Sequence, residues 1–259
     1  MTDRNIILET HNLTRAFRGF KAVSGVNLRI ARGTIHALIG PNGAGKTTCF
    51  NLLTKFLEPD AGQIVFNGQD ITREAPAQVA RRGIIRSFQI SAVFPHLTVL
   101  ENLRVGLQRQ QGTAFQFWRS GRTTEAHDAR AMALLEDVEL GEFADTPAVE
   151  LSYGRKRALE IATTLAMEPE LMLLDEPTQG MGHEDVSRVS ALIRRVSAGR
   201  TVLMVEHNMS VIAGISDAIT VLQRGTILAE GTYNEITGNP LVREAYMGSA
   251  QAVPEGAHA

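Results

Sequence analysis

The sequence predicts an α/β fold in which a helical segment interrupts a core of alternating strands and helices. The first observation is an apolar run at 34–40 that ends in glycine and precedes a helical pattern at 46–57, the order of a buried strand, a tight turn and a helix. The second is a stretch from about Pro95 to Met167 in which apolar residues recur at helical spacing. The third is the return of alternating apolar runs and helical patterns after residue 170.

The N-terminal third is rich in predicted strands. Short runs of apolar and β-branched residues predict them at 7–10, 26–30, 34–40, 63–68 and 84–89. Helices are expected at 46–57, where three apolar residues share one face, and from Pro76 to near Gly83.

The helical segment and the returning core follow in order. Helical spacing predicts helices at 98–107, 125–138 and 153–167, with a loop at 112–124. The core continues with strands at 171–176 and 201–206, helices at 183–196 and 209–216, a hairpin at 218–231 with Gly225 at its turn, and a closing helix at about 240–248. We therefore expect one domain over 1–248, with a helical subdomain inserted at about 90–167 and a disordered tail at 249–259.

Composition argues against several classes of protein. The 259 residues include 26 Lys and Arg against 28 Asp and Glu, a net charge of −2, which gives no support for bulk binding to nucleic acid. Basic residues gather at 81–82, 155–157 and 194–195, and each group is interpreted as a solvated helix face. Cys49 is the single cysteine, so no internal disulfide can form, and we expect it to be a buried packing residue. The N-terminus lacks the pattern of a signal peptide and no apolar run reaches the ~20 residues that span a bilayer, so work at a membrane would require a partner.

A glycine-rich motif lies between the strand at 34–40 and the helix that follows. It matches the pattern G-x-x-x-x-G-K-[ST] and comprises Gly40, Pro41, Asn42, Gly43, Ala44, Gly45, Lys46, Thr47 and Thr48. The glycines allow successive backbone N–H groups to turn inward around an anion, and the helix N-terminus adds its positive dipole end. Lys46 is expected to reach the β- and γ-phosphates of ATP, and the Thr47 hydroxyl to ligate Mg²⁺. The strand–loop–helix context favours a phosphate-binding loop over an ordinary glycine-rich turn.

An apolar run at 171–174 leads directly into Asp175 and Glu176. Such a strand would carry the aspartate to an edge beside the phosphate loop, where it can hold Mg²⁺ through water. Glu176 would then accept a proton from the attacking water as general base. An apolar run ending in Asp-Glu is a weak signal alone, but after a complete phosphate loop it predicts an ATP-hydrolysing site.

Three further features favour the same kind of site. Ser152 and Gly154 open a predicted helix and would form a second anion-binding element. His207 follows a predicted strand, where it could reach the γ-phosphate, and Gln89 ends another, where its carboxamide could ligate Mg²⁺. Taken singly, a Ser-x-Gly is usually a helix cap, a histidine a surface residue and a glutamine without function. The order of the three features along the chain is what supports the functional interpretation.

The order of phosphate loop, glutamine, Ser-x-Gly, Asp-Glu and histidine resembles the ATP-binding cassette (ABC) family over nearly the whole chain. The resemblance implies a P-loop NTPase core of the RecA-like type, with an antiparallel β subdomain and an inserted α-helical subdomain. It also makes Phe17 the aromatic residue that stacks on adenine. In this family two cassettes pack head to tail, so Ser152 and Gly154 of one would face the γ-phosphate held by Lys46 of the other.

Several segments resemble one subfamily, the ATPases of branched-chain amino-acid importers. These segments lie at 89–108, 125–140, 151–162 and 238–248. In that subfamily the ATPase works with a second, non-identical ATPase, two membrane permeases and a periplasmic solute-binding protein. The resemblance implies a peripheral protein at the cytoplasmic face of the inner membrane that couples ATP hydrolysis to amino-acid uptake, with Phe94 as a coupling residue toward the permease.

Other functions stay open. Substrate choice would lie in the permease and binding protein, so a cassette for lipopolysaccharide export or for uptake of urea, amides or aromatic acids fits the same site. A non-transport ABC protein acting on ribosomes or DNA is less favoured, because the chain has one cassette and a near-neutral charge. A P-loop kinase would leave Ser152, Gly154 and His207 unexplained.

Two positions depart from the family pattern. Arg155 stands where the signature usually continues with glutamine, which would alter contacts to the ribose across the dimer. Gly182 stands where a loop Asp or Asn is usual. Glu184 or Asp185 could take that place, but both are also simply the acidic residues that suit a helix N-terminus.

Overall fold

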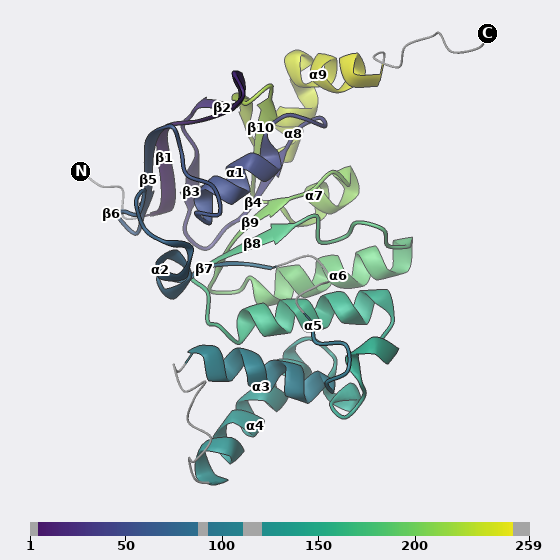
Figure 1. Cartoon of the computed structure of the whole chain (residues 1–259). Coiled ribbons are helices and arrows are strands. Elements are labelled where there is room, and N and C mark those ends of the chain that lie inside the picture. The colour runs from purple at the N-terminus through teal and green to yellow at the C-terminus, as the bar shows by residue number, and fades with distance from the viewer. Residues whose placement is uncertain (1–4, 88–92, 111–120, 251–259) are drawn as a thin grey trace, which may run out of the picture. The chain divides into compact units, whose positions relative to one another are not determined.

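The computed structural model of the chain describes residues 5–87, 93–110 and 121–250 (Figure 1). The chain forms two compact units. Unit 1 holds residues 1–79 and 205–259, and unit 2 holds residues 80–204. No helix in the described ranges combines the length and the apolar composition that crossing a bilayer requires.

The first part of unit 1 is an antiparallel sheet. Its strands are β1 (Ile6–Phe17), β2 (Phe20–Val26), β3 (Arg29–Ala31), β5 (Ala61–Phe66) and β6 (Gln69–Asp70). They lie in the order β2-β1-β5-β6, and β3 pairs with β1 beside this path. The sequence predicted one strand at 26–30, whereas the structure places two strands, β2 and β3, on either side of residues 27–28.

The second part of unit 1 leads to the phosphate loop. Strands β4 (Ile35–Ile39) and β10 (Ala218–Gln223) pair in parallel, and β11 (Thr226–Gly231) pairs with β10 in an antiparallel hairpin. All five residues of β4 are buried, as suits a parallel strand covered on both faces. Gly225 lies at the hairpin turn with a φ of 81°, as predicted. The helices of this unit are α1 (Lys46–Leu53), α2 (Pro76–Arg81, which ends at the boundary with unit 2), α7 (Met209–Ile215), α8 (Tyr233–Gly238) and α9 (Pro240–Ala250).

Two helices of unit 1 differ from the prediction. Helix α1 ends four residues before the predicted Leu57, because Lys55 has a φ of 62°, a left-handed conformation that cannot continue a helix. The Lys55 ammonium is fully buried and pairs with Glu58 at 2.6 Å, a local contact that outweighs the helical periodicity. Helix α8 was not predicted, although Thr232 and Glu235 form a capping box and their T-x-x-E spacing is readable in the sequence.

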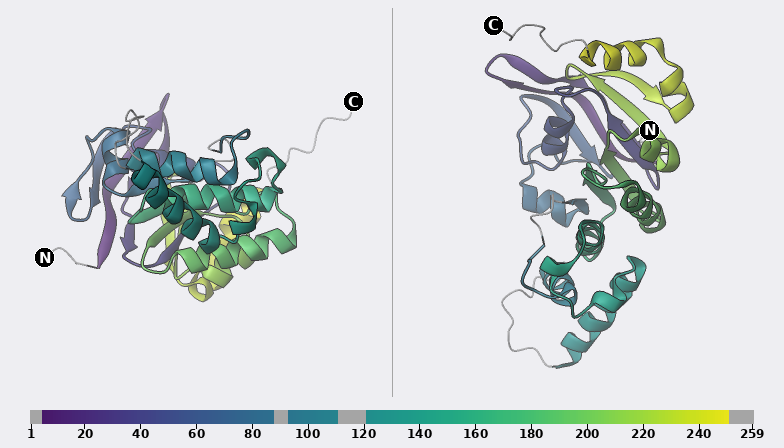
Figure 2. Two further views of the ribbon diagram at one scale, coloured as in Figure 1. Left: turned by 90° about the horizontal axis from the view of Figure 1, so that it is seen from below. Right: turned by 90° about the vertical axis from the view of Figure 1, so that its right-hand side faces the viewer.

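Unit 2 combines three strands with four α-helices among its described residues. Strands β7 (Ile84–Arg86), β8 (Leu171–Asp175) and β9 (Thr201–Val205, which ends at the boundary with unit 1) lie in the order β9-β8-β7. The helices are α3 (Val99–Gln110), α4 (Gly121–Asp137), α5 (Tyr153–Leu165) and α6 (His183–Val196). Helices α3 and α4 pack on each other and on α5 (Figure 2). Residues 121–124 belong to α4 and not to the loop predicted at 112–124, and the rest of that loop, at 112–120, lies outside the described residues.

Cys49 lies on α1 and is fully buried, as predicted. Burial raises the pKa of its thiol to about 12, because a thiolate in this apolar setting would lose its hydration. The side chain therefore stays a neutral packing group at physiological pH.

Candidate nucleotide site

The structure divides the predicted site residues between the two units. Unit 1 carries the phosphate loop, Phe17 and His207, and unit 2 carries Ser152, Gly154, Asp175 and Glu176. Gln89 lies outside the described residues. The two parts of the site are built from different elements.

The phosphate loop connects the end of β4 to the start of α1, as the sequence predicted. Its three glycines have positive φ values, 148° at Gly40, 77° at Gly43 and 103° at Gly45, which side chains with a Cβ rarely adopt. A Cβ on Gly40 would also collide with the backbone carbonyl of Leu222, and one on Gly45 with that of Ala22. The loop is thus a tight backbone cradle of the kind that N–H groups form around phosphates.

Lys46 places a positive charge at this cradle. Its ammonium donates to the carbonyl oxygens of Gly40 at 2.7 Å and Pro41 at 3.1 Å, so the side chain folds back over the loop. Lys46 also begins α1, whose N-terminus adds a favourable dipole for an anion. Thr47 is exposed in the first turn of the same helix, and Thr48 is partly exposed. The cradle, the ammonium and the hydroxyl fit a polyphosphate accompanied by a divalent cation.

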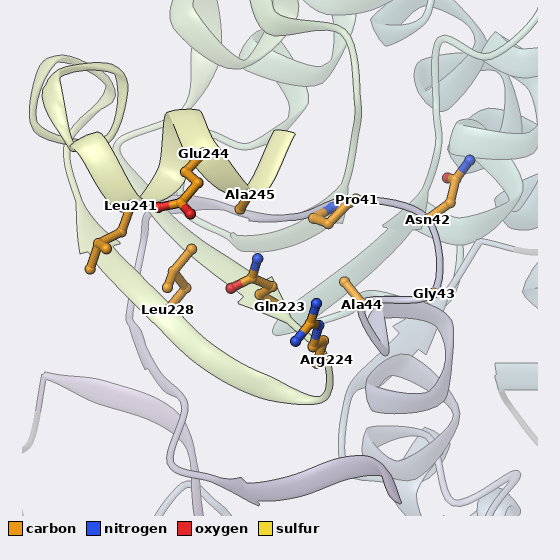
Figure 3. A pocket seen from close by; sticks show the side chains of 10 residues that line it. All are labelled: Pro41, Asn42, Gly43, Ala44, Gln223, Arg224, Leu228, Leu241, Glu244 and Ala245. Carbon is orange, nitrogen blue, oxygen red and sulfur yellow. The ribbon is translucent and has the colours of Figure 1, made fainter. Parts of the chain in front are cut away.

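Helix α9 contributes to the outer side of the loop. A cavity of about 480 Å³ lies between the loop, the end of the β10–β11 hairpin and α9 (Figure 3). The Glu244 carboxylate and the Gln223 amide point toward this space, and Pro41 and Ala44 line its loop side (Figure 3). Tyr246, also on α9, forms a hydrogen bond with the backbone of Gly40. Burial nevertheless raises the pKa of Tyr246, so its hydroxyl stays protonated beside the loop. Sequence reasoning missed this contact.

His207 follows β9, as predicted, and has a buried carboxylate beside it. The side chain of His207 is 59% exposed, whereas that of Glu206 is fully buried. The Glu206 carboxylate accepts from the His207 backbone N–H at 2.9 Å and lies 3.7 Å from its ring Nδ1. The Glu206 carboxylate is therefore hydrogen-bonded to the backbone of His207 and lies close to its ring.

Phe17 lies at the C-terminal end of β1 and is 41% exposed. The guanidinium of Arg15 lies 5.1 Å from the centre of its ring. An exposed ring at a strand end can stack on a flat ligand, and Arg15 adds a cation to the same surface.

Asp175 and Glu176 lie at the end of β8 in unit 2. Asp175 is buried, and its Oδ2 accepts from Nη2 of Arg86 at 2.5 Å. Arg86 ends β7, which pairs in parallel with β8, so the sheet register places this cation beside the aspartate. Glu176 has a φ of 46°, a strained backbone for a residue with a side chain, and such strain is common at functional sites.

Ser152 and Gly154 begin helix α5. Ser152 occupies the N-cap position, but its hydroxyl makes no capping hydrogen bond, and the residue is exposed. Gly154 is buried, and a Cβ placed on it would lie 2.7 Å from Oδ1 of Asp185. The hydroxyl therefore faces solvent at a helix N-terminus, while the glycine allows α6 to approach closely.

The two departures from the family pattern have local explanations. Arg155 stacks on Phe143, with its guanidinium 4.0 Å from the ring centre. Gly182 is the N-cap of α6. Of the two acidic residues that could replace an aspartate there, Glu184 is 88% exposed and pairs with Arg188, whereas Asp185 lies against Gly154.

Phe94, the predicted coupling residue, is 51% exposed in unit 2. Its backbone N–H donates to Oδ1 of Asn102 at 2.7 Å, and the Asn102 amide donates back to the Phe94 carbonyl at 3.1 Å. Asn102 itself is buried on α3. The helix thus holds the Phe94 backbone while the side chain is half exposed.

Comparisons with known proteins agree with this geometry. The family described as ABC transporter matches residues 23–179, and the family described as Branched-chain amino acid ATP-binding cassette transporter matches residues 226–252. The chain is 40% identical over 254 residues to the high-affinity branched-chain amino acid transport ATP-binding protein BraF of Pseudomonas aeruginosa, covering 94% of this chain and 98% of that protein. The identity and both coverages are the same for LivG of Escherichia coli K12.

Solved structures give the same result. A nucleotide-free ATP-binding cassette from an ABC transporter superposes with a TM-score of 0.82 at 31% identity, over 93% of this chain and 98% of that one. The ADP conformation of MJ1267, an ATP-binding cassette of an ABC transporter, gives a TM-score of 0.83 at 32% identity, over 94% and 99%. A dimeric post-hydrolysis state of the cassette MJ0796, bound to ADP and Pi, gives 0.74 at 25% identity, over 88% and 99%.

Fold and phosphate loop together define an ATP-binding cassette, a nucleotide-binding ATPase. The chain belongs to the ABC transporter family, and within it to the branched-chain amino acid cassettes that include BraF and LivG. The predicted α/β fold class and the resemblance to the ABC family are confirmed.

Proposed function

We propose that the chain is the ATP-hydrolysing subunit of an importer that takes up branched-chain amino acids across the cytoplasmic membrane. The main support is its 40% identity to BraF over 94% of its length, together with the branched-chain cassette match at 226–252. BraF and LivG are both named for high-affinity branched-chain amino acid transport.

Within one subunit, the residues would divide the work of ATP hydrolysis. The loop N–H groups and Lys46 hold the β- and γ-phosphates, and Thr47 and Asp175 hold Mg²⁺, the latter through water. Glu176 accepts a proton from the attacking water, and His207, whose backbone is held by a buried carboxylate, contacts the γ-phosphate. The bound nucleotide supplies the phosphoanhydride bond whose cleavage releases the energy.

The remaining residues would contact the adenine, the metal or a partner protein. Phe17 stacks on adenine, and Gln89 ligates Mg²⁺ and responds to the nucleotide. Ser152 and Gly154 contact the nucleotide of a second cassette, so the site is completed by dimerisation; their exposed hydroxyl and helix N-terminus support this. We expect the dimer to act at the cytoplasmic face of the inner membrane with two permeases and a periplasmic solute-binding protein, and Phe94 to contact the permease.

The test is a solute-stimulated ATPase assay on the chain co-purified with its permeases and second ATPase. With the complex in vesicles and the binding protein added, leucine, isoleucine or valine should raise the rate of phosphate release. Glu176→Gln should abolish hydrolysis while Mg-ATP still binds, since only the general base is lost.

Glu168→Gln is the matched control. Glu168 is also a glutamate of unit 2 with a left-handed backbone, φ 49°, but its side chain is 57% exposed in an ion pair with Arg130. This variant should hydrolyse ATP at the wild-type rate. Unchanged hydrolysis in Glu176→Gln would contradict the assigned mechanism, and stimulation by urea or aromatic acids instead of branched-chain amino acids would contradict the assigned substrate.

A further inference from the structure

The backbone on both sides of Glu176 is bound by one side chain of helix α5. Arg157 is 5% exposed. Its Nη2 donates to the carbonyl oxygen of Asp175 at 2.8 Å, and its Nε donates to that of Pro177 at 3.1 Å. The rigid planar guanidinium therefore connects the residue before Glu176 to the residue after it.

Arg157 is kept in place by a buried counter-ion. Its Nη1 donates to Oε2 of Glu160 at 2.5 Å, and Glu160 is only 1% exposed. Burial raises the pKa of Glu160 more than the nearby guanidinium lowers it. The second carboxylate oxygen has no hydrogen-bond partner among the described residues. An ion pair buried at such a desolvation cost contributes little net stability to the fold. Stability alone therefore does not explain why the pair is present.

The same face of α5 makes a second contact with this segment. The Tyr153 hydroxyl donates to the carbonyl oxygen of Gln179 at 3.1 Å, and Gln179 donates its backbone N–H to the carbonyl oxygen of Glu176 at 3.1 Å. Tyr153 and Arg157 are four residues apart, one turn of the helix, and so project from one face. Together they bind the segment 175–179 at three carbonyl groups.

We propose that Arg157 is a positioning residue that sets the backbone of Glu176 and joins it to the helix that begins with Ser152 and Gly154. The proposal rests on the function proposed above, in which Glu176 activates water and the start of α5 contacts the nucleotide of a second cassette. Binding at that helix start would then be transmitted to the general base through hydrogen bonds of the same helix, one turn further along.

The central test compares two changes of the buried pair in the co-purified complex. Arg157→Lys keeps the charge that Glu160 needs, but a single ammonium cannot form the planar fork to two carbonyls. Arg157→Met combined with Glu160→Leu removes the pair and leaves no buried charge, so it should still fold. Both should lower kcat about 100-fold, as a misplacement of about 1 Å does, and leave KM for ATP within about twofold.

A second readout does not depend on hydrolysis. Hydrogen exchange of the full-length chain reports on the Gln179 amide, whose acceptor is the Glu176 carbonyl. Exchange there should become about tenfold faster or more in both variants, with no change across α6. Lys156→Met is the control, because Lys156 lies beside Arg157 on α5 but donates to Val149 at 2.9 Å instead.

The outcomes separate the two proposals. Wild-type kcat and wild-type Gln179 exchange in both Arg157 variants would overturn the positioning role. Normal kcat in the double variant with loss only in Arg157→Lys would also overturn it, because the double variant equally lacks the guanidinium that binds the two carbonyls. If the wild-type complex does not hydrolyse ATP, or Glu176→Gln still does, the proposed function fails, and the exchange result still decides the positioning role.

Discussion

His36 should make the stability of the protein depend on pH in a predictable way. It lies in β4, the strand that leads to the phosphate loop, and is only 4% exposed. Its Nε2 lies 2.8 Å from the Thr220 hydroxyl, which itself donates to Glu230 at 2.8 Å. Because the Thr220 hydroxyl donates its proton to Glu230, it must accept a hydrogen bond from His36 Nε2. Nε2 therefore carries a proton, as in the neutral Nε2–H tautomer or in the cation.

Burial decides between these two forms. It lowers the pKa of His36 from 6.5 to about 4, so the folded state holds the neutral ring. Between these two values the unfolded chain binds the extra proton and the folded chain does not. The contribution of His36 to stability is therefore fully present above pH 6.5 and is lost as the pH falls toward 4. At about 1.4 kcal/mol for each pH unit, the free energy of unfolding should fall by about 2 kcal/mol between pH 7 and pH 5.

The assay is urea unfolding followed by circular dichroism at pH 7, 6 and 5. His36→Gln removes the titrating group while its amide can still donate to Thr220, so this variant should lose about 2 kcal/mol less than the wild type between pH 7 and 5. His183→Gln replaces an exposed histidine of α6 and should keep the wild-type pH dependence. Parallel curves for His36→Gln and the wild type would refute the reasoning.

Other changes test the loop and the surface. Gly45→Ala should abolish binding of a fluorescent ATP analogue, because its Cβ would collide with a backbone carbonyl of β2. Gly43→Ala has open space around the new Cβ and should cost only the left-handed backbone penalty of about 1–2 kcal/mol, measured by urea unfolding. Arg195→Ala breaks an ion pair with Glu139 in which both side chains are about half exposed, so the free energy of unfolding should fall by less than about 1 kcal/mol. Cys49 should react with a thiol reagent only in the unfolded protein; rapid labelling of the native chain would contradict its burial.

The sequence predicted correctly those elements whose bounds depend on residues within the element itself. Helix α6 has the predicted bounds, 183–196, because its apolar spacing, acidic first turn and basic last turn all lie within the helix itself. The phosphate loop was predicted for the same reason. The predicted end of α1 was wrong because the real end depends on the buried ammonium of Lys55. The helical periodicity of the sequence does not reveal that burial.

Contacts between residues far apart in the chain could not be predicted from a single sequence. Arg86 pairs with Asp175 across 89 positions of sequence, and only the parallel register of β7 with β8 brings them together. The contact of Tyr246 with Gly40 depends in the same way on where α9 packs. Residues that form a motif are adjacent in sequence, whereas residues that hold a motif in place need not be.

The burial of Arg157, in contrast, could have been predicted from residues close to it in the sequence. The basic run at 155–157 was interpreted as a solvated helix face, which is wrong for Arg157. The helical spacing within α5 shows where the run departs from a solvated face. The buried stripe of α5 includes Gly154, Ile161 and Leu165, and Arg157 falls on it at i+3 from the first and i−4 from the second. A charged residue on a buried stripe needs a partner, and the acidic residue three positions on, Glu160, lies on the same side. The sequence therefore contained enough information to predict a buried ion pair one turn after Ser152 and Gly154. It did not indicate which backbone carbonyls, those of Asp175 and Pro177, the remaining N–H groups of the guanidinium would bind.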